Sequence, residues 1–240
     1  MPKPELTKEP QFGLSLNDIQ IIDAFKDLSL ETQKELLNIC MLKTIAKDEV
    51  LFANHDVING LYAIVSGKIQ LLRYSANGQK RVFFILSEGA LINEVVFDNL
   101  HVSIDCECFE DAKLLYIPKN ELLSIMKKDF DLTLNILNSS GRKQRRLYRQ
   151  LKNTVQTRMD RKLAAKLWKL AKDHGKKDES GVWTIISIDI TVTYLSHLLG
   201  VPRETISRAL KELIDNDLVC WFNKSLAVKE EEILEYYRTL

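Results

Sequence analysis

Two short helical runs, separated by a glycine and a proline, constrain this chain more than any other feature of its sequence. In the first run the apolar residues recur at helical spacing until Gly200 and Pro202 interrupt the pattern. A second run opens at Pro202, whose fixed φ suits the start of a helix. Its apolar residues can share one buried face: Ile206, Ala209, Leu210, Leu213 and Ile214. Residues 190–218 therefore predict a helix-turn-helix.

The opposite face of the second helix carries polar side chains that suit the reading of duplex DNA. Five of them fall on one stripe, at spacings of three and four: Arg203, Glu204, Ser207, Arg208 and Lys211. An Arg can grip guanine with two hydrogen bonds, a Glu can accept from the cytosine amino group, and a Ser can serve either role. Thr205 and Lys211 are better placed for phosphate. An ordinary helix with a solvated charged face would show the same pattern, so DNA binding is a hypothesis at this point.

The uneven distribution of charge agrees with that hypothesis. Residues 1–140 hold 14 Lys and Arg against 20 Asp and Glu, whereas residues 141–240 hold 20 against 13. Most of the positive excess lies between Arg142 and Lys177. A basic region is the expected footprint of phosphate binding, although many Lys-rich helices are merely solvated.

Length and composition predict a two-domain globular protein. The chain has 240 residues, of which 45% are hydrophobic and 28% charged, enough to bury two modest cores. No apolar run approaches a membrane span, and the first ten residues lack a signal-peptide core. We expect a cytoplasmic protein.

The first half of the chain changes from helical to β-type patterning. Phe12 to Met41 reads as amphipathic helix, and short β-type runs follow from Leu42. Five turn signals punctuate them at fairly regular intervals: Asp48-Glu49, Asn59-Gly60, Ser66-Gly67, Asn77-Gly78 and Glu88-Gly89. The clearest hairpin is centred on Asn77-Gly78, between residues 69–74 and 81–86. This spacing favours a small barrel or sandwich.

After Pro118 the pattern returns to helix, with one long apolar series at spacings of three and four. The series consists of Met126, Phe130, Leu134, Leu137, Gly141, Gln144, Tyr148, Leu151 and Val155. It is typical of a coiled-coil seam, weakened in the middle by Gly141 and Gln144. A helix lying on its own barrel would give a similar pattern. Because helix-turn-helix proteins usually bind DNA as two-fold dimers, we predict a homodimer.

The remaining segments complete the pattern of a winged helix domain. Asn153 to His174 reads as helix, Gly175 to Gly181 as a polar loop, and Trp183 to Ile188 as a strand. Residues 218–222 and 225–228 flank Asn223-Lys224, which predicts a β-hairpin wing. Lys224 at its tip would touch backbone phosphate.

Two segments resemble the Crp/Fnr family of transcription regulators. The string GVPRETISRALKEL is similar to that family's recognition helix, and residues 61–94, from LYAIVSGKIQ to LINE, are similar to its cyclic-nucleotide-binding-type barrel. The resemblance covers nearly the whole chain after residue 20. It implies an α+β protein with a sensor β-barrel (a double-stranded β-helix) and helical cap at 1–120, a long dimerisation helix at 121–155, and a winged helix-turn-helix domain at 156–240. It also implies an effector, a palindromic promoter site, and RNA polymerase as a partner.

The expected effector site departs from the family pattern. The cyclic-AMP receptor protein uses Phe-Gly-Glu-Leu followed by Arg-Ser, whereas this chain has Asn93 in place of the glycine and Val102 in place of the Arg. Only Glu94 and Ser103 match. Without the Arg a charge-assisted contact to a cyclic phosphate is missing, so we do not expect cyclic AMP to bind. We expect another small molecule as the effector. Its pocket would be lined by Tyr74, Phe83, Asn93, Glu94, Val95, Val102 and Ser103, although aromatic residues on strands more often belong to the core.

A redox- or haem-dependent gas sensor of the same architecture is an alternative. Cys106 and Cys108 lie two apart on an expected strand, so that both thiols face one side. Reduced, buried thiols are the simpler interpretation, because no iron-sulfur cysteine cluster is present. Haem could be held by His55 or His101, with Pro2 in the place of the proline that the family's carbon-monoxide sensor uses. We expect no bound cofactor or metal.

Catalysis and protein–protein signalling are the rival classes of function. The four His residues are scattered, and the sequence contains no H-E-x-x-H, P-loop, G-x-G-x-x-G or G-x-S-x-G string. We therefore do not expect an enzyme. A nucleotide-type sensor that acts on a protein partner would leave the stripe of Arg203, Glu204 and Arg208 without a purpose.

Overall fold

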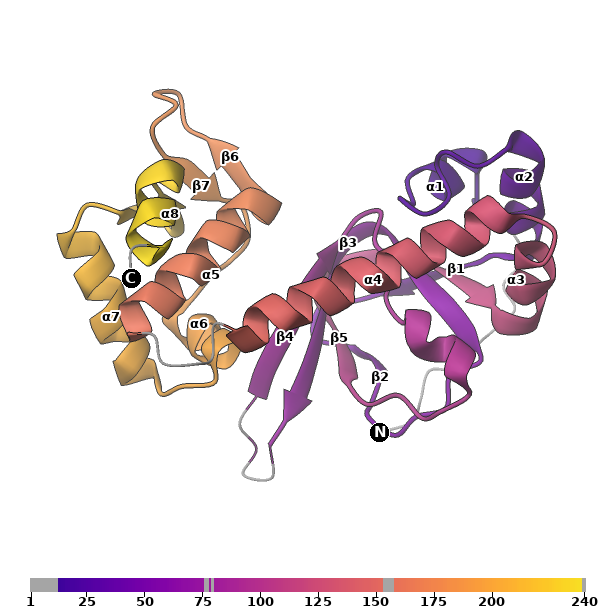
Figure 1. The fold of residues 1–240 in the computed structure, drawn as a ribbon, viewed down its shortest axis with the longest axis horizontal. Coiled ribbons are helices and arrows are strands. Elements are labelled where there is room, and N and C mark those ends of the chain that lie inside the picture. The colour runs from indigo at the N-terminus through magenta and orange to yellow at the C-terminus, as the bar shows by residue number, and fades with distance from the viewer. Residues whose placement is uncertain (1–12, 76–77, 79, 153–157, 239–240) are drawn as a thin grey trace. The chain divides into compact units, whose positions relative to one another are not determined.

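The protein divides into two compact units in a computed structural model that describes residues 13–75, 78, 80–152 and 158–238 (Figure 1). The first unit comprises Met1–Arg73 and Phe83–Leu147, and the second comprises Tyr74–Val82 and Tyr148–Leu240. None of the described helices is long and apolar enough to cross a membrane.

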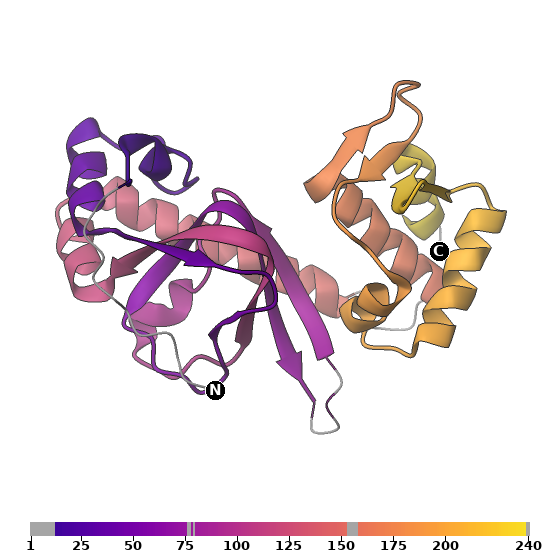
Figure 2. The same cartoon turned by 180° about the vertical axis from the view of Figure 1, so that it is seen from behind.

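The first unit is built on an antiparallel sheet, as the turn spacing predicted. Its strands are β1 (Met41–Ile45), β2 (Val50–Phe52), β3 (Gly60–Tyr74), β4 (Lys80–Ser87) and β5 (Asp105–Pro118). They follow the order β1-β5-β3-β4, and β2 also pairs with β5. The long strands β3 and β5 run side by side, with Leu61 opposite Ile117 and Leu72 opposite Asp105 (Figure 2). The two strands of the predicted hairpin, β3 and β4, are neighbours in the sheet. Gly78, in the connection between them, has a left-handed φ of 77°. Asn77 lies outside the described residues.

Two apolar clusters lie on the two faces of this sheet. The inner cluster includes Ile64, Ile69, Phe84, Leu86 and Leu114, all buried. The outer cluster joins strand residues to the flanking helices through Phe25, Leu36, Leu61, Leu122 and Leu132. Burial of apolar surface on both faces is the main force that holds the unit together.

Ser66-Gly67 forms a β-bulge and not the predicted turn. Gly67 lies within β3 at a φ of 83°, and the register against β5 shifts on either side of it. A Cβ atom there would lie 2.1 Å from the carbonyl oxygen of Asp111. The residue must therefore be glycine, and the strand continues because the extra residue is absorbed by the bulge.

The helices of the first unit differ from the prediction at their ends. The predicted helical segment Phe12 to Met41 contains α1 (Leu16–Gln20) and α2 (Leu30–Ile39), and Met41 already belongs to β1. Residue 12 is outside the described part. Ser29 caps α2 by accepting a hydrogen bond from the backbone N–H of Thr32 at 3.2 Å.

The long predicted seam begins later than the sequence suggested. Met126 ends α3 (Lys119–Met126) and packs on the outer cluster, and α4 (Phe130–Lys152) starts after a short break. Asp129 ends this break and accepts a hydrogen bond from the Leu132 backbone N–H at 3.0 Å, which satisfies a free amide at the start of α4. Val155 lies outside the described residues.

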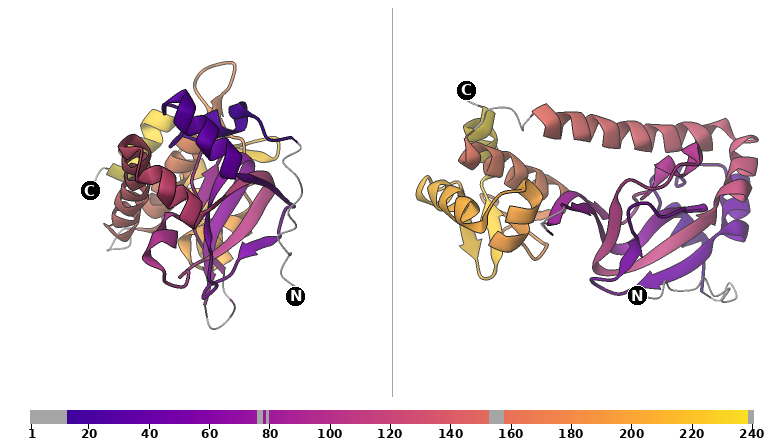
Figure 3. Two further views of the ribbon diagram at one scale, coloured as in Figure 1. Left: turned by 90° about the vertical axis from the view of Figure 1, so that its right-hand side faces the viewer. Right: turned by 90° about the horizontal axis from the view of Figure 1, so that it is seen from below.

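Helix α4 has two faces that point in opposite directions. Leu132 and Ile136 are buried against the first unit, and Ser139, Lys143 and Arg146 continue the same face at spacings of three and four. The opposite face carries the rest of the predicted seam. Gly141 is partly exposed there, and the other members are exposed: Phe130, Leu134, Leu137, Gln144, Tyr148 and Leu151. Figure 3 shows the helix extending along the strands of the first unit. The apolar side chains of this outer face are thus largely exposed to solvent in the described part of the chain.

Among its described residues, the second unit combines a four-stranded sheet with the four helices α5 to α8. Its elements are α5 (Met159–His174), β6 (Gly175–Lys177), β7 (Thr184–Ile186), α6 (Val192–Leu199), α7 (Arg203–Asp215), β8 (Val219–Phe222), β9 (Ser225–Val228) and α8 (Glu230–Arg238). The sheet order is β6-β7-β9-β8. Part of the predicted loop at 175–181 is thus a strand that pairs with β7. The predicted helix from Asn153 is described only from Met159, because residues 153–157 are outside the described part.

Candidate functional site

The helix-turn-helix is formed by α6 and α7, at the positions that the sequence predicted. Thr191 begins α6, and its hydroxyl accepts a hydrogen bond from the Tyr194 backbone N–H at 3.0 Å. Gly200 ends it in the left-handed region at a φ of 67°, and its N–H donates to the Ser196 carbonyl at 2.8 Å. This ending matches a glycine C-cap. Pro202 then precedes the first residue of α7.

Helix α7 buries its apolar face and exposes its polar stripe. Ile206, Ala209, Leu210 and Leu213 are buried as predicted, whereas Ile214 is 36% exposed, so its predicted burial is wrong. Ile214 lies one residue from the end of the helix, past the last position that the neighbouring elements cover. The stripe residues are all exposed: Arg203, Glu204, Ser207, Arg208 and Lys211. Thr205 is partly exposed, in the first turn of the helix, where free amides favour anions.

A two-residue hairpin joins β8 and β9 where the wing was predicted. Phe222 pairs with Ser225, and Asn223 adopts a left-handed φ of 56°, as a tight turn of this kind requires. Lys224 at the tip is exposed. Trp221 and Phe222 are also exposed, which the sequence did not single out.

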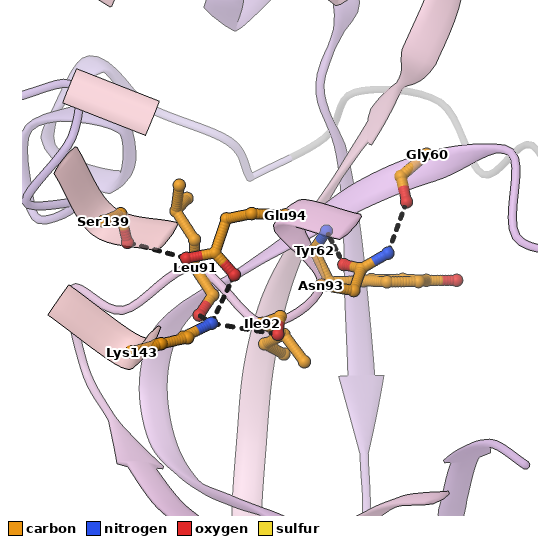
Figure 4. Close-up of polar contacts among 8 residues, drawn as sticks. All are labelled: Gly60, Tyr62, Leu91, Ile92, Asn93, Glu94, Ser139 and Lys143. Atoms are coloured by element: carbon orange, nitrogen blue, oxygen red, sulfur yellow. Dashed lines mark hydrogen bonds and ion pairs between the residues drawn. The ribbon is translucent and has the colours of Figure 1, made fainter. Parts of the chain in front are cut away.

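In the first unit, Asn93 acts as a clamp on the backbone of β3. Its side-chain oxygen accepts a hydrogen bond from the Tyr62 N–H at 2.8 Å, and its side-chain nitrogen donates to the Gly60 carbonyl at 2.9 Å. Asn93 is buried, and Figure 4 shows its amide turned toward the strand. The amide is therefore engaged with the chain itself.

The next residue, Glu94, connects this segment to α4 through a buried ion pair. Its carboxylate accepts a hydrogen bond from the Ser139 hydroxyl at 2.7 Å and pairs with the Lys143 ammonium (Figure 4). Lys143 also donates to the carbonyl oxygens of Leu91 at 2.7 Å and Ile92 at 3.0 Å. Only 4% of the Glu94 side chain and 19% of the Lys143 side chain are exposed. The ion pair is thus shielded from solvent screening.

Burial and charge act in opposite directions on Lys143. Desolvation lowers the pKa of its ammonium below the usual value, while the Glu94 carboxylate opposes that change. One turn further along the same face, the Arg146 guanidinium lies 5.2 Å from the centre of the Phe84 ring. Three side chains that carry hydrogen-bond donor groups, Ser139, Lys143 and Arg146, therefore follow one another on the inner face of α4.

The other residues predicted for the effector site are dispersed. Tyr74, Val95 and Ser103 are exposed, and Phe83 is partly buried against the inner cluster. Val102 is a buried member of that cluster, and its backbone pairs with His55 and Asp56. Of the predicted set, Glu94 contacts α4, and its neighbour Asn93 contacts β3. A role for any of them in binding an effector stays a prediction.

Family models match both units of the chain. Residues 42–129 match the cyclic nucleotide-binding domain, and residues 161–237 match the Crp-like helix-turn-helix domain. The chain belongs to the Crp/Fnr family of transcription regulators. The first match spans β1 to α3, including Glu94, and the second spans α5 to α8, including the exposed stripe of α7.

Individual members of the Crp/Fnr family share this architecture at low sequence identity. A CRP-like cAMP-activated global transcriptional regulator of Mycobacterium tuberculosis is 21% identical over 78% of this chain and 84% of its own length. The cyclic AMP receptor protein of Thermus thermophilus is 26% identical over 77% and 82%, respectively. The structure of FixK2 from Bradyrhizobium japonicum aligns with a TM-score of 0.70 at 14% identity, covering 82% of this chain and 96% of that one.

The residues named for a redox or haem sensor lie in two different environments of the first unit. Cys106 and Cys108 both lie in the inner cluster, fully buried, so they face one side as predicted. Desolvation raises the pKa of the Cys108 thiol to about 11 and raises the pKa of the Cys106 thiol well above its usual value. His55 and His101 are exposed, outside both clusters; Pro2 is outside the described residues. Among the described residues, no three His, Cys, Asp or Glu side chains are grouped to hold a metal ion.

Sequence reasoning missed Ser139 and Lys143 as partners of the expected effector segment. The signal was present, because both residues lie on the face of α4 opposite the apolar seam, at a spacing of four. It could not be used without knowing that this face packs against the first unit. A surface hollow of about 470 Å³ next to the start of α4, lined in part by Thr32, Asp129 and Phe130, was also not expected.

Proposed function

We propose that this Crp/Fnr member is a transcription regulator that binds a palindromic promoter site as a homodimer, under the control of a small effector. In this proposal α7 enters the major groove, and Arg203, Glu204, Ser207 and Arg208 contact base edges. Thr205, Lys211 and Lys224 contact phosphate. The single observation that carries the proposal is the exposed polar stripe of α7 on a helix whose other face is buried.

The homodimer is supported by the outer face of α4. Leu137 is 61% exposed and Tyr148 is 59% exposed, and both belong to a series that repeats every seven residues. A row of large apolar side chains in water is unfavourable, and a second copy of the same helix would cover it. A two-fold pair would also present two copies of α7 to the two halves of a palindrome.

Control by an effector is supported by the contacts between the sensor segment and α4. Glu94 is held by Ser139 and Lys143, so a ligand that changes this segment also changes the helix that would form the dimer interface. Coupling of this kind requires only that the effector bind one state of the dimer more tightly than the other. RNA polymerase is the partner that such a regulator would act on.

The stripe is tested by DNA selection followed by substitution of Arg208. Wild-type protein is used to enrich a binding site from random duplex DNA, and affinities are then measured by fluorescence anisotropy at several salt concentrations. We expect Arg208→Ala to weaken binding to the selected site by about 1–3 kcal/mol and to relax base preference at one position. The physical reason is the loss of a two-bond contact to a base edge.

The matched control is Arg238→Ala, which removes the same charge from an exposed position in the same unit, at the end of α8. This variant should retain the base preference of the wild type. If Arg208→Ala bound selected and random DNA with unchanged preference, the assigned docking of α7 would be wrong. Failure of the wild-type protein to enrich any sequence, both alone and in the presence of mixtures of small metabolites that supply candidate effectors, would reject the proposed function itself.

A further inference from the structure

The inner face of α4 changes character along its length. Its first part is apolar, with Leu132 and Ile136 packed in the outer cluster. Its second part presents a hydroxyl, an ammonium and a guanidinium, from Ser139, Lys143 and Arg146, toward the first unit. Such donor groups are costly to turn toward a protein interior unless an acceptor meets them there. Their chemistry suits an oxygen anion.

The carboxylate of Glu94 now fills the role of that anion. One of its oxygens accepts from Ser139 at 2.7 Å and the other pairs with Lys143. The side chain comes from η1 (Glu94–Asp98), a 3-10 turn whose next residue, Val95, is exposed. A new side-chain conformation of Glu94, together with a shift of the short turn η1, would therefore move its carboxylate from the buried position into water.

The position of Lys143 also accounts for the missing Arg of the sensor segment. Val102, where the family pattern has the Arg, is buried in the inner cluster and offers no charge. Lys143 contacts the carbonyl oxygens of Leu91 and Ile92, in the same segment, from the side of α4. The long helix α4 thus supplies a cation, the Lys143 ammonium, to this segment. The negative charge that pairs with it comes from the same chain, from the carboxylate of Glu94.

We propose that Ser139 and Lys143 form an anion-binding site for the effector, in which the carboxylate of Glu94 serves as an internal ligand that an external carboxylate or phosphate replaces. This inference rests on the proposed function and assigns the chemical class of its effector. Binding exchanges one ion pair for another, so Lys143 keeps a counter-ion throughout. Glu94 moves into water, and η1 is released from α4. The exchange therefore alters the contact between the sensor segment and the proposed dimer helix.

The site is tested by removing the internal ligand and supplying anions from solution. Glu94→Ala is melted in acetate and, separately, in inorganic phosphate, each against chloride at constant ionic strength. Once the anion exceeds its dissociation constant, we expect the melting temperature to rise by about 3–5 °C for each tenfold increase. The response to acetate or to phosphate shows which anion the site takes. The double variant Glu94→Ala, Lys143→Met should show neither response.

The control is Glu35→Ala, which breaks a surface ion pair with Lys128 at 3.1 Å. It should respond to acetate and phosphate no differently from the wild type. An absence of any specific response in Glu94→Ala, or an equal response in the double variant, would overturn the proposal. Because no DNA is present in the assay, this outcome is independent of the test of α7.

A second measurement decides the matter if Glu94→Ala does not fold in chloride. Recovery of folding by acetate or phosphate, and not by chloride, would count as the expected result. Hydrogen exchange of residues 94–98 is measured in the wild type and in Lys143→Met over the same anion series. Exchange should accelerate with anion in the wild type alone. Identical, anion-independent exchange in both proteins would reject the site.

Discussion

At the scale of single residues, Asn93 shows how a side chain can replace a strand. The family pattern has glycine at this position, and the substitution predicted a residue that lines the effector pocket. In the structure both ends of its amide pair with backbone groups of Gly60 and Tyr62, as a neighbouring strand would. The sequence located the segment correctly, but these partners are more than thirty residues away and only the folded chain brings them together.

Asn93→Ala should therefore destabilise the first unit. The substitution leaves one buried N–H and one buried carbonyl without partners, and each such group costs about 1–3 kcal/mol. We expect a loss of about 2–4 kcal/mol in the free energy of unfolding, measured by urea denaturation. Asn120→Ala, at an exposed position of α3, serves as the control and should stay within about 0.5 kcal/mol of the wild type. Equal stability of the two variants would contradict the clamp.

At the scale of elements, sequence patterns predicted the structure best where a clear turn signal separates two periodic segments. The helix-turn-helix and the wing have the expected positions because Gly200, Pro202 and Asn223-Lys224 combine turn chemistry with clear flanking periodicity. The pattern misled at Ser66-Gly67, where glycine marks a bulge inside a strand. Turn and bulge both require a left-handed residue, and only the pairing of β3 with β5 distinguishes them.

The junction of α5 and α8 provides a prediction on pH. The carboxyl of Asp160 is buried, which by itself raises its pKa, but hydrogen bonds from Tyr236 at 2.6 Å and Arg158 at 3.1 Å outweigh burial and lower the pKa below its usual value. A lowered folded-state pKa means that these contacts stabilise the protein above the unfolded-state pKa of about 3.9. The stabilisation is lost as the pH falls through the folded-state pKa.

Thermal melts from pH 7 to pH 3 test this contact. Asp160→Asn should melt several degrees below the wild type at pH 7. The difference should begin to narrow below about pH 4, where the carboxyl of the unfolded chain takes up a proton, and should disappear once the pH falls below the lower folded-state pKa. Asp215→Asn, an exposed residue at the end of α7, should show little difference at either pH. A gap between Asp160→Asn and the wild type that is the same at all pH values would show that the charge of Asp160 is not involved.

At the scale of the whole molecule, the outer face of α4 determines whether the proposed regulator is a dimer. The sequence predicted this seam but left open whether it packs on the protein's own barrel. The structure places Leu132 and Ile136 on the barrel side and leaves Leu137 and Tyr148 exposed. Sequence could not choose between the two faces, because Ser139, Lys143 and Arg146 make the inner face look like a solvated one.

Leu137→Glu should therefore dissociate the proposed homodimer. A carboxylate in the middle of an apolar interface loses its hydration without gaining a partner, and the two-fold pair would bring two such charges together. We expect the dimer dissociation constant, measured by analytical ultracentrifugation, to rise about a hundredfold or more. Asn138→Glu, one residue further along the helix and exposed, should leave it within about threefold. A dimer that tolerates Leu137→Glu would refute this interface.

The two faces of α4 also determine which genetic changes the helix can accept. Substitutions alter one face at a time, so the barrel contacts and the exposed stripe can vary independently. A single inserted residue changes both faces at once, because it rotates every later residue by about 100° around the helix axis. An insertion between Ile136 and Ser139 would turn Lys143 away from Glu94 and, in the same step, put Tyr148 and Leu151 out of line with Leu134. Length in this stretch should therefore be fixed even where residue identity is free.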